Sequence, residues 1–484
     1  MIGLLLMLST LFTPIDASAS QTRFSESTVT GTEAYEAVSG GKRRKTVIGS
    51  HKSEDRLLLP NARKRLAGNA RDLTRNFSIV AWAVRRHLDY ITQFQFHART
   101  ADKGFNRELE RLVDVYGRKS KFDAVGKHSR AMMLRLLEAH AILDGDNGWV
   151  KRSDGTVQGL EGDRVRNPPL PDLTAWTHGI QTEYGGKALA YAVHKRTLSG
   201  FEFERIVPAR NMLWHGYFAR YDQIRGVSPI SSGLNLARDV HENFDLALAK
   251  LKVTQIFAMA ILRAAGAEEN PGQLTGGEDA DGNEDKADYT TDFGAGPVML
   301  DMDHGDDAKV LESSTPSDQF QSYTLQIVMA FLKSLDIPFS FYDESHTNFF
   351  GSRGSWLHYE RSCDFKREQL EDLLDAWTYW RLTLAILDGE LTLPSGKTLS
   401  DLDWLWVARG MPWWDPAKEI RGDLMAIQAG LTNPQEVCRR RDSGEYYDNI
   451  DKISEAIEYA QNKNVPVSFA PGPDPVEVVA NDGK

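Results

Sequence analysis

This 484-residue sequence is poor in cysteine, in net positive charge and in long apolar segments. Its only cysteines, Cys363 and Cys438, exclude a disulfide framework and a metal site built mainly of cysteine. Lys and Arg number 57 against 68 Asp and Glu, and the formal net charge of −11 excludes a globally basic nucleic-acid binder. A hydrophobic fraction of 41% with 26% charged residues excludes a polytopic membrane protein, so we expect no membrane association.

The first twenty residues contain an apolar run, 2–12, that is too short to cross a bilayer as a helix. Ala17-Ser18-Ala19 resembles a small-residue cleavage site, but no basic residue precedes Arg23, as a secretory signal requires. Two interpretations stay open: a signal peptide, and an apolar N-terminal arm or a start codon placed too early. The absence of a basic residue near the N-terminus favours an apolar arm or a misplaced start codon over a signal peptide. We expect 1–55 to be a flexible arm.

Charge is distributed in two opposite blocks. Residues 42–86 hold thirteen Lys and Arg against three acidic residues, whereas 268–292 hold nine acidic residues and a single Lys286. The basic block is typical of a solvated arm followed by an amphipathic helix; a second interpretation is a surface that meets phosphate or an acidic neighbouring subunit. The acidic block has few apolar residues, and we expect a long solvated loop there.

Apolar periodicity predicts an α+β protein in which helices dominate. Helical repeats cover five segments: 56–86, 106–142, 231–262, 315–336 and 363–387. The alternation of 180–193 around Gly185-Gly186 predicts a β-hairpin, and a further strand region follows at 203–214 with a turn at Pro208. The acidic block lies between two of the long helices, so we expect a helical hairpin with a charged excursion at its tip.

Pairs of a capping residue and a proline mark three helix starts, one for the segment 315–336 and two for further, shorter helices. These pairs are Thr315-Pro316, Asp415-Pro416 and Asn433-Pro434. The polar, glycine-containing 343–355 is expected to be a loop, and the proline-rich 466–484 a disordered tail.

Three catalytic or metal-binding motifs begin in this sequence and are not completed. His241-Glu242 opens a helical zinc motif, but Asp245 stands where the second His is required. Ser395-Gly396-Lys397-Thr398 ends like a phosphate-binding loop without the glycine five places earlier, which favours a turn between strands. The alternating oxygen ligands of 279–285 resemble a calcium loop, but Thr290 replaces its bidentate Glu. We therefore predict no catalytic residue, no metal site and no cofactor.

Four motifs follow one another along the chain. They are Gly179-Ile180-Gln181-Thr182-Glu183-Tyr184-Gly185-Gly186-Lys187 with Ala190-Tyr191-Ala192-Val193, Gln223-Ile224-Arg225-Gly226-Val227-Ser228-Pro229, Asn348-Phe349-Phe350-Gly351-Ser352-Arg353 with Glu360-Arg361, and Gly430-Leu431-Thr432 with Arg439-Arg440-Arg441. In this order they resemble the lambda-like bacteriophage portal proteins over about 56–460. The sequence departs from the family pattern at Gly186-Lys187 and at Gly351-Ser352, and the acidic stretch after Leu262 has no counterpart in it.

The resemblance implies a helix-dominated, portal-type subunit with a wing, a two-helix stem, a clip and a crown. The segments that we expect are the arm 1–55, the wing 56–230, the stem helices 231–262 and 315–336, the clip 263–314, the tunnel loop, long helix and wing return 337–415, the crown helices 416–465 and the tail 466–484. It also implies a ring, usually a dodecamer, at one capsid vertex of the virion, assembled in the host cytoplasm.

The expected partners follow from the same resemblance. They are other copies of the chain, the terminase large subunit, head-completion and connector proteins, the major capsid and scaffolding proteins, and double-stranded DNA that passes through the channel. The DNA-facing tunnel-loop residues would be Asn348, Phe349, Phe350 and Arg353.

The net acidic charge is compatible with such a conduit. Each Lys or Arg on a phosphate adds affinity and slows sliding, so we predict a channel lining whose charges are mostly acidic, with basic residues confined to narrow bands. Two other functions stay open at this point. An exported hydrolase would be a monomer cleaved near Ala19, and a phage DNA-processing enzyme would show metal-dependent turnover.

Overall fold

The structure is a computed structural model that describes residues 53–58, 60–256, 259–263, 306–310, 318–343, 345, 348–410 and 415–467. Several predictions lie outside these residues: the arm over 1–52, the calcium-like stretch 279–285, most of the clip, the Thr315-Pro316 cap and the tail over 468–484. Within the described part, no helix is long and apolar enough to span a membrane.

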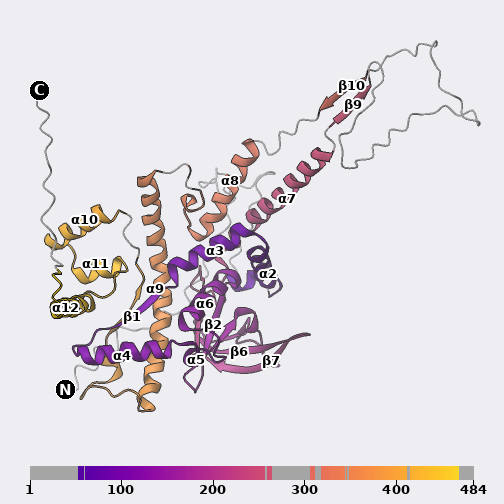
Figure 1. Ribbon diagram of the computed structural model, residues 1–484. Helices are drawn as coiled ribbons and strands as arrows, with labels where there is room; N and C mark the ends of the chain where they lie inside the picture. Colours follow the sequence, from indigo (N-terminus) through magenta and orange to yellow (C-terminus); the bar gives the residue numbers. More distant parts are fainter. Residues whose placement is uncertain are drawn as a thin grey trace, which may run out of the picture. The chain divides into compact units, whose positions relative to one another are not determined.

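Helices dominate the described residues and strands form small sheets, which confirms the predicted α+β class (Figure 1). The helices are α1 (Glu54–Leu57), α2 (Pro60–Asn76), α3 (Ser78–Ile91), α4 (Lys103–Tyr116), α5 (Lys119–Phe122), α6 (Arg130–Asp144), α7 (Leu234–Ile256), α8 (Asp318–Leu332), α9 (Phe349–Leu387), α10 (Pro416–Gln428), α11 (Pro434–Arg440) and α12 (Tyr446–Asn462). The strands are β1 (Phe94–Ala98), β2 (Asp146–Lys151), β3 (Val157–Glu161), β4 (Trp176–Thr177), β5 (Ile180–Thr182), β6 (Ala188–Thr197), β7 (Gly200–Pro208), β8 (Met212–Gly216), β9 (Met259–Arg263), β10 (Asp306–Val310) and β11 (Trp404–Ala408).

Two antiparallel sheets occupy the region between α6 and α7. One has the strand order β4-β5-β6-β7 and the other β3-β2-β8. The predicted hairpin is confirmed as β5 and β6, and its turn contains Gly185 and Gly186 at φ 104° and 89°, which residues with a Cβ rarely adopt. The predicted strand region 203–214 is β7 and β8, separated by a short turn after Pro208. The rings of Tyr191 and Trp214 pack between the two sheets with centroids 5.1 Å apart.

The predicted helices 56–86 and 106–142 are each interrupted. Phe77 separates α2 from α3 with an extended backbone and buries its ring against α7. In the second segment, the Asp123 carboxylate accepts three backbone N–H groups of the following turn, and Gly126 has φ 70° there. α4 ends earlier, at Tyr116, and these local hydrogen bonds hold the non-helical turn between the short helix α5 and α6, although the apolar repeat continues through it.

The two long helices on either side of the acidic block pack against each other, as predicted. However, α7 ends at Ile256, and the helix expected up to 262 is wrong beyond that point. Met259–Arg263 is strand β9, paired with β10 in antiparallel register from Met259–Val310 to Arg263–Asp306. The four apolar residues from Met259 to Leu262 do not distinguish a helical from a strand period, which explains the error. α8 continues as a 3₁₀ turn and ends at Asp336, whose φ is 60°.

The polar loop expected over 343–355 is also wrong in its second half. α9 begins at Phe349, fourteen residues before the expected start, and runs for 39 residues to Leu387. The side chain of Asn348 caps it by accepting the N–H of Gly351 at 2.7 Å. Gly351 and Gly354 have low helix propensity, so the sequence pattern obscured this first turn.

The C-terminal helices begin as the caps predicted. The side chains of Asp415 and Asn433 accept N–H groups from the first turns of α10 and α11. Gly396 lies in a turn at φ 74°, but this turn connects α9 to β11 and not two strands. Contacts of α12 with α4 include an ion pair of 2.6 Å between Arg107 and Asp451 and a cation–π contact of Lys103 with Tyr447.

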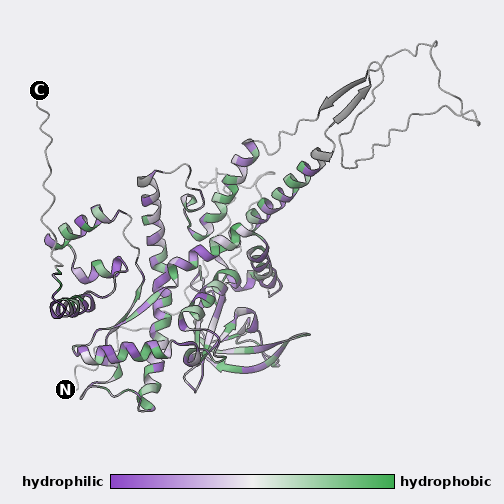
Figure 2. Cartoon of the chain, in the orientation of Figure 1, coloured by the Kyte–Doolittle hydropathy of each residue, from purple (hydrophilic) through white to green (hydrophobic). Residues whose placement is uncertain are grey.

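Two large hydrophobic clusters and two smaller ones in the sheets form the core, and α9 contributes to both large clusters. Figure 2 shows hydrophobic and hydrophilic residues alternating along α9. The first large cluster surrounds Trp149, Trp377 and Trp406, and the second lies among α2, α3, α7, α8 and the first half of α9. Among the described residues, none from α10–α12 belongs to either cluster. The first cluster therefore joins α9 to the β2–β3–β8 sheet, and the second joins it to the long helix pair.

We expect Trp377→Ala to lower the free energy of unfolding by about 3–5 kcal/mol, because it leaves a cavity beside Phe122 and Trp406. Tyr379, two residues further along α9, is 50% exposed, so Tyr379→Ala is the matched control. Denaturant unfolding followed by circular dichroism measures both. Equal losses of unfolding free energy for the two variants would contradict the place of Trp377 in the first hydrophobic cluster.

Candidate functional site

The four residues predicted to face DNA lie at the start of α9. Asn348 is exposed and caps the helix. Phe349 and Phe350 form its first turn, and their side chains lie outside the described residues. Arg353 follows one turn later on the same helix. These four positions therefore lie together at the N-terminal end of α9, and this helix occupies the second half of the segment that was expected to be a loop.

Arg353 has an acidic partner that the sequence did not indicate. Its guanidinium forms an ion pair with Glu419 of α10, a side chain that is 7% exposed. Glu419 also accepts from Arg441 at 2.6 Å, and Arg441 pairs with Asp423 at 3.2 Å. This group of four charges connects the start of α9 to the C-terminal helices and partly neutralises Arg353.

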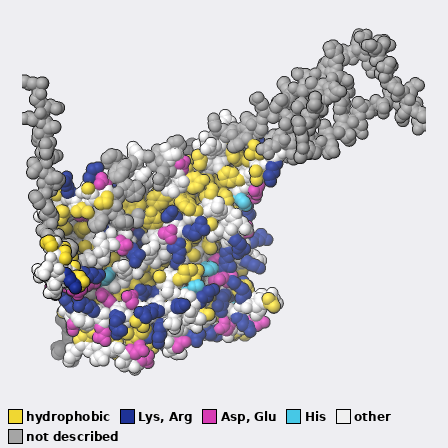
Figure 3. Space-filling view, in the orientation of Figure 1, with side chains coloured by type: hydrophobic (Ala, Val, Ile, Leu, Met, Phe, Trp, Pro, Cys, Tyr) yellow, Lys and Arg dark blue, Asp and Glu magenta, His cyan; other side chains and the backbone are white. Residues whose placement is uncertain are grey.

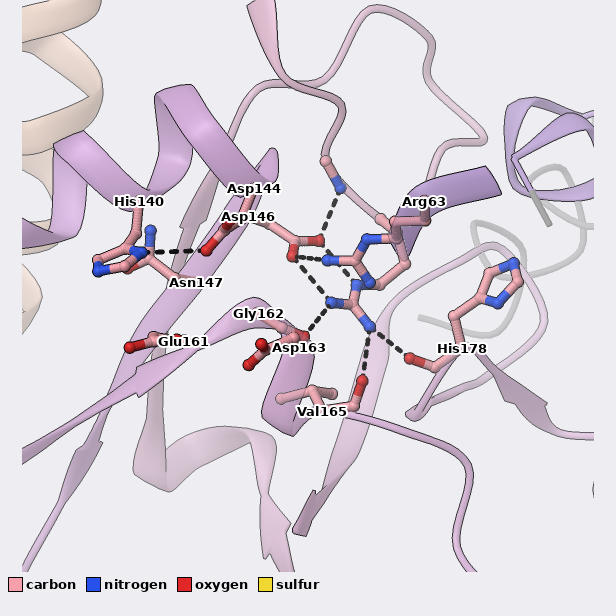
Figure 4. A network of polar contacts seen from close by, with 12 residues as sticks. Arg63, His140, Asp144, Asp146, Asn147, Glu161, Gly162, Asp163, Val165 and His178 are labelled. Carbon is pink, nitrogen blue, oxygen red and sulfur yellow. Dashed lines mark hydrogen bonds and ion pairs between the residues drawn. The ribbon is translucent and has the colours of Figure 1, made fainter. Parts of the chain in front are cut away.

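A second polar group is almost fully buried and lies just before α7 (Figure 4). Arg225 is 1% exposed, and its guanidinium donates to both oxygens of Asp146, at 2.7 and 2.8 Å. Its remaining N–H groups donate to the carbonyl oxygens of Gly162, Val165 and His178. All five donors of the guanidinium are therefore paired, which offsets the cost of burying its charge.

Further groups close around this pair. Asp146 also pairs with Arg63 of α2 and accepts the N–H of Gly226 at 2.7 Å. Burial, and then the charge of Arg225, lower the pKa of Arg63 to about 10, so it remains protonated at neutral pH. The carboxylate of Asp55 accepts the N–H groups of Ile224 and Arg225, at 2.9 Å each. A Cβ at Gly226 would lie 2.1 Å from the oxygen of Gly145, so only glycine fits there.

The arrangement fixes the base of α7. It joins α1, α2, the α6–β2 corner and the connections around β4 to the segment 223–229 that leads into α7. The resemblance of segment 223–229 to the portal family did not indicate a role for Arg225. Asp146 gave no signal in the sequence, because its partner lies 79 residues away.

One group of possible metal ligands occurs among the described residues: His140, Asp144 and Glu161. Both oxygens of Asp144 accept from Arg71, at 2.7 and 2.6 Å, and Glu161 pairs with Arg196 at 2.7 Å. Two guanidinium groups beside these carboxylates repel a cation and occupy the lone pairs that it would need. The cluster is therefore an ion-pair network and a poor fit for a metal.

His140 belongs to this network through a 3.0 Å contact of Nδ1 with Asp144 (Figure 4). Burial alone lowers the pKa of His140, but the hydrogen bond and charge of Asp144 outweigh it, and the pKa is raised above 6.5. The protonated form is thus favoured in the folded state.

Hydrophobic side chains also gather at the surface of the long helix pair (Figure 3). Those with 40% or more exposure are Phe244, Leu246, Leu248 and Tyr323. His241 packs its ring against Phe77 at 5.1 Å, and it belongs to no group of three or more possible metal ligands among the described residues.

Comparison with known proteins gives one family match. The model described as "Phage portal protein, lambda family" matches residues 40–367. None of the curated proteins compared matches the chain. A chain of the "Virion of native gene transfer agent (GTA) particle" is 14% identical at a TM-score of 0.46, and the match covers 78% of this chain and 92% of that one.

Two further solved structures are similar to the same degree. A chain of the "Neck of empty GTA particle computed with C6 symmetry" is 14% identical at a TM-score of 0.46, with 76% and 92% of the two chains covered. A chain of the "Neck of native GTA particle computed with C12 symmetry" is 15% identical at 0.45, with 78% and 92% covered. Because these TM-scores lie below 0.5, the family match alone carries the assignment.

We expect Arg225→Lys to lower the free energy of unfolding by about 3 kcal/mol, because a single ammonium cannot serve the five positions of the guanidinium and leaves buried acceptors unpaired. Arg409, which is about half exposed, provides the control Arg409→Lys, with a change below about 0.5 kcal/mol. Denaturant unfolding measures both. An Arg225→Lys variant with an unchanged free energy of unfolding would show that the planar, five-donor geometry of the guanidinium is unimportant for stability.

The raised pKa of His140 makes its contribution to stability depend on pH. A raised folded-state pKa stabilises the fold fully below pH 6.5 and loses this contribution as the pH rises through the folded value. We expect the stability difference between the wild type and His140→Gln to be about 1 kcal/mol larger at pH 5.5 than at pH 8.5. His358→Gln is an exposed control. A difference that grows with pH would contradict the ion pair with Asp144.

Proposed function

Because this chain belongs to the lambda family of phage portal proteins, we propose that its copies form a closed ring at one capsid vertex through which DNA is packaged and ejected. The observation that carries the proposal is the family match over residues 40–367, which spans both long helices and the start of α9. Family membership favours this role over an exported hydrolase or a DNA-processing enzyme, and we expect no catalytic turnover.

The long helix pair supports the assignment of a stem. α7 and α8 pack together, and the strands β9 and β10 pair beyond the end of α7. We propose α7 and α8 as the stem, and the segment between them as the clip that meets the terminase and later the head-completion proteins. The acidic composition of 268–292 suits docking to a basic partner surface.

The remaining elements suit the other parts of a portal subunit. We assign α2–α6 and the sheets β2–β8 to the wing, and α10–α12 to the crown. The buried pair of Arg225 and Asp146 would then hold the stem rigidly to the wing. The ring would lie in the virion after assembly in the host cytoplasm, with capsid and scaffolding proteins as neighbours.

We further propose that Asn348, Phe349, Phe350 and Arg353 approach the DNA in the channel. Asn348 is exposed at the N-terminal end of α9, where the helix dipole attracts phosphate. Pairing with Glu419 keeps Arg353 from acting as a free cation. A channel lining with few free cations would guide the duplex without binding it tightly. This agrees with the predicted lining, whose charges are mostly acidic.

We expect the purified full chain to form annular particles, twelve-fold in the simplest case, in negative-stain images and mass photometry. The same particles should leave duplex DNA intact in the presence of Mg²⁺. A deletion of residues 1–52 tests the N-terminal arm and keeps Asp55 in place. If the basic residues of 42–52 contact a neighbouring copy, the particles of the deletion variant should dissociate at a lower salt concentration than those of the full chain. A chain that stays monomeric, or that cleaves DNA, would contradict the proposed function.

A further inference from the structure

Two charged helix faces form no ion pair with any other residue that the structure describes. The basic face consists of Lys64, Arg65 and Arg75 on α2, and the acidic face of Glu368, Glu371 and Asp372 on α9. We propose that the basic face of one copy binds the acidic face of the next copy around the ring. This inference rests on the proposed ring and identifies which surfaces close it.

The three cations of the basic face are all exposed. None of them forms an ion pair with another described residue, whereas Arg63 and Arg71 of the same helix do. Figure 3 shows Lys and Arg side chains gathered at the edge of the molecule where Figure 1 places α2. The helix thus buries the cations that serve its own subunit and presents the others outward.

The acidic face is likewise unpaired within the described residues. Glu368 and Asp372 are exposed, and Glu371 is partly buried beside them. Burial, and then the like charges of Asp375 and Glu368, raise the pKa of Glu371 to about 6. The charge of Arg367 lowers the pKa of Glu371, but burial and the neighbouring carboxylates outweigh it, so the acidic face carries an excess of negative charge.

The two faces have matching lengths. Lys64 and Arg75 are eleven residues apart, which is about 16 Å along a helix and returns to nearly the same side of it. Asp364 and Asp375 flank the acidic face on α9 and are separated by the same eleven residues. These two have partners within the subunit: Asp364 pairs with Arg367 at 2.9 Å, and Asp375 accepts from the indole N–H of Trp404 at 2.9 Å. Two helices of this pattern can align opposite charges over three turns.

The placement of the faces favours a ring over a pair. α3 packs against both α2 and α9 and lies between them (Figure 1). A contact between two different faces of identical subunits is heterologous, and it forms a closed ring or a filament instead of a two-fold dimer. DNA phosphate is the other conceivable partner of the basic face, but it would leave the acidic face unexplained.

Charge reversal of the full chain tests the pairing. Variant A carries K64E, R65E and R75E, and variant B carries E368K, E371K and D372K. We expect each variant alone to need an about tenfold higher concentration for half-assembly, because three exposed ion pairs become repulsive. An equimolar mixture of A and B should assemble like the wild type, since alternating subunits restore every contact, and so should a chain with all six changes. The control E455K/E458K, on exposed positions of α12, should assemble normally.

Mass photometry reports the assembly and circular dichroism the fold. Normal assembly of variant A or of variant B alone would overturn the proposal. It would also be overturned if neither the mixture nor the chain with all six substitutions regained normal assembly. If A or B is unfolded alone, the neutral variants K64Q/R65Q/R75Q and E368Q/E371Q/D372N replace them, and rings whose salt dependence is unchanged would overturn it. Rings of variant A that form normally but no longer retain DNA would assign the basic face to DNA. A wild type that forms no ring would contradict the proposed function itself.

Discussion

The fold depends on a charge pair that would be very costly to bury without its full set of partners. Arg225 and Asp146 are at most 1% exposed, and every donor of the guanidinium has an acceptor. Breaking such a pair leaves an uncompensated charge in the interior, so the surrounding backbone must keep its carbonyl groups in place. The close approach of Gly226 to Gly145 follows from this, because the turn before α7 has to pass directly over the carboxylate. One ion pair thus positions the sheets, α2 and the base of the long helix pair together.

A different kind of contact holds the C-terminal helices. α10–α12 contribute nothing to the two large hydrophobic clusters among the described residues, and their contacts with the rest of the chain include ion pairs such as Arg107–Asp451 and Arg353–Glu419. Exposed pairs such as Arg107–Asp451 contribute little stability individually and weaken with salt, whereas Glu419 of the other pair is buried and is less screened. Stability is therefore concentrated in the part of the chain that carries the helix pair, while the C-terminal helices are attached electrostatically.

The sequence was sufficient where the signal is local. The hairpin turn at Gly185 and Gly186 and the caps Asp415 and Asn433 all follow from residues within one or two turns of each other. It failed where distant residues decide. Phe77 breaks a helix because of a neighbour far along the chain, and β9 is a strand because β10 pairs with it. The partner of Arg353 and the role of Asp146 also depend on contacts across the fold, which the pattern of one sequence does not encode.

The continuity of α9 has a mechanical consequence. A single helix of 39 residues, about 58 Å long, supplies Leu370 and Leu374 to one hydrophobic cluster and Tyr359 and Cys363 to the other. The two hydrophobic clusters cannot rotate relative to each other unless α9 bends. α9 contains no proline, and no π-bulge interrupts the part of it that the structure describes. A displacement of α9 between the two clusters is therefore transmitted along the helix axis, and bending is expected first near Gly351 and Gly354 at its N-terminal end.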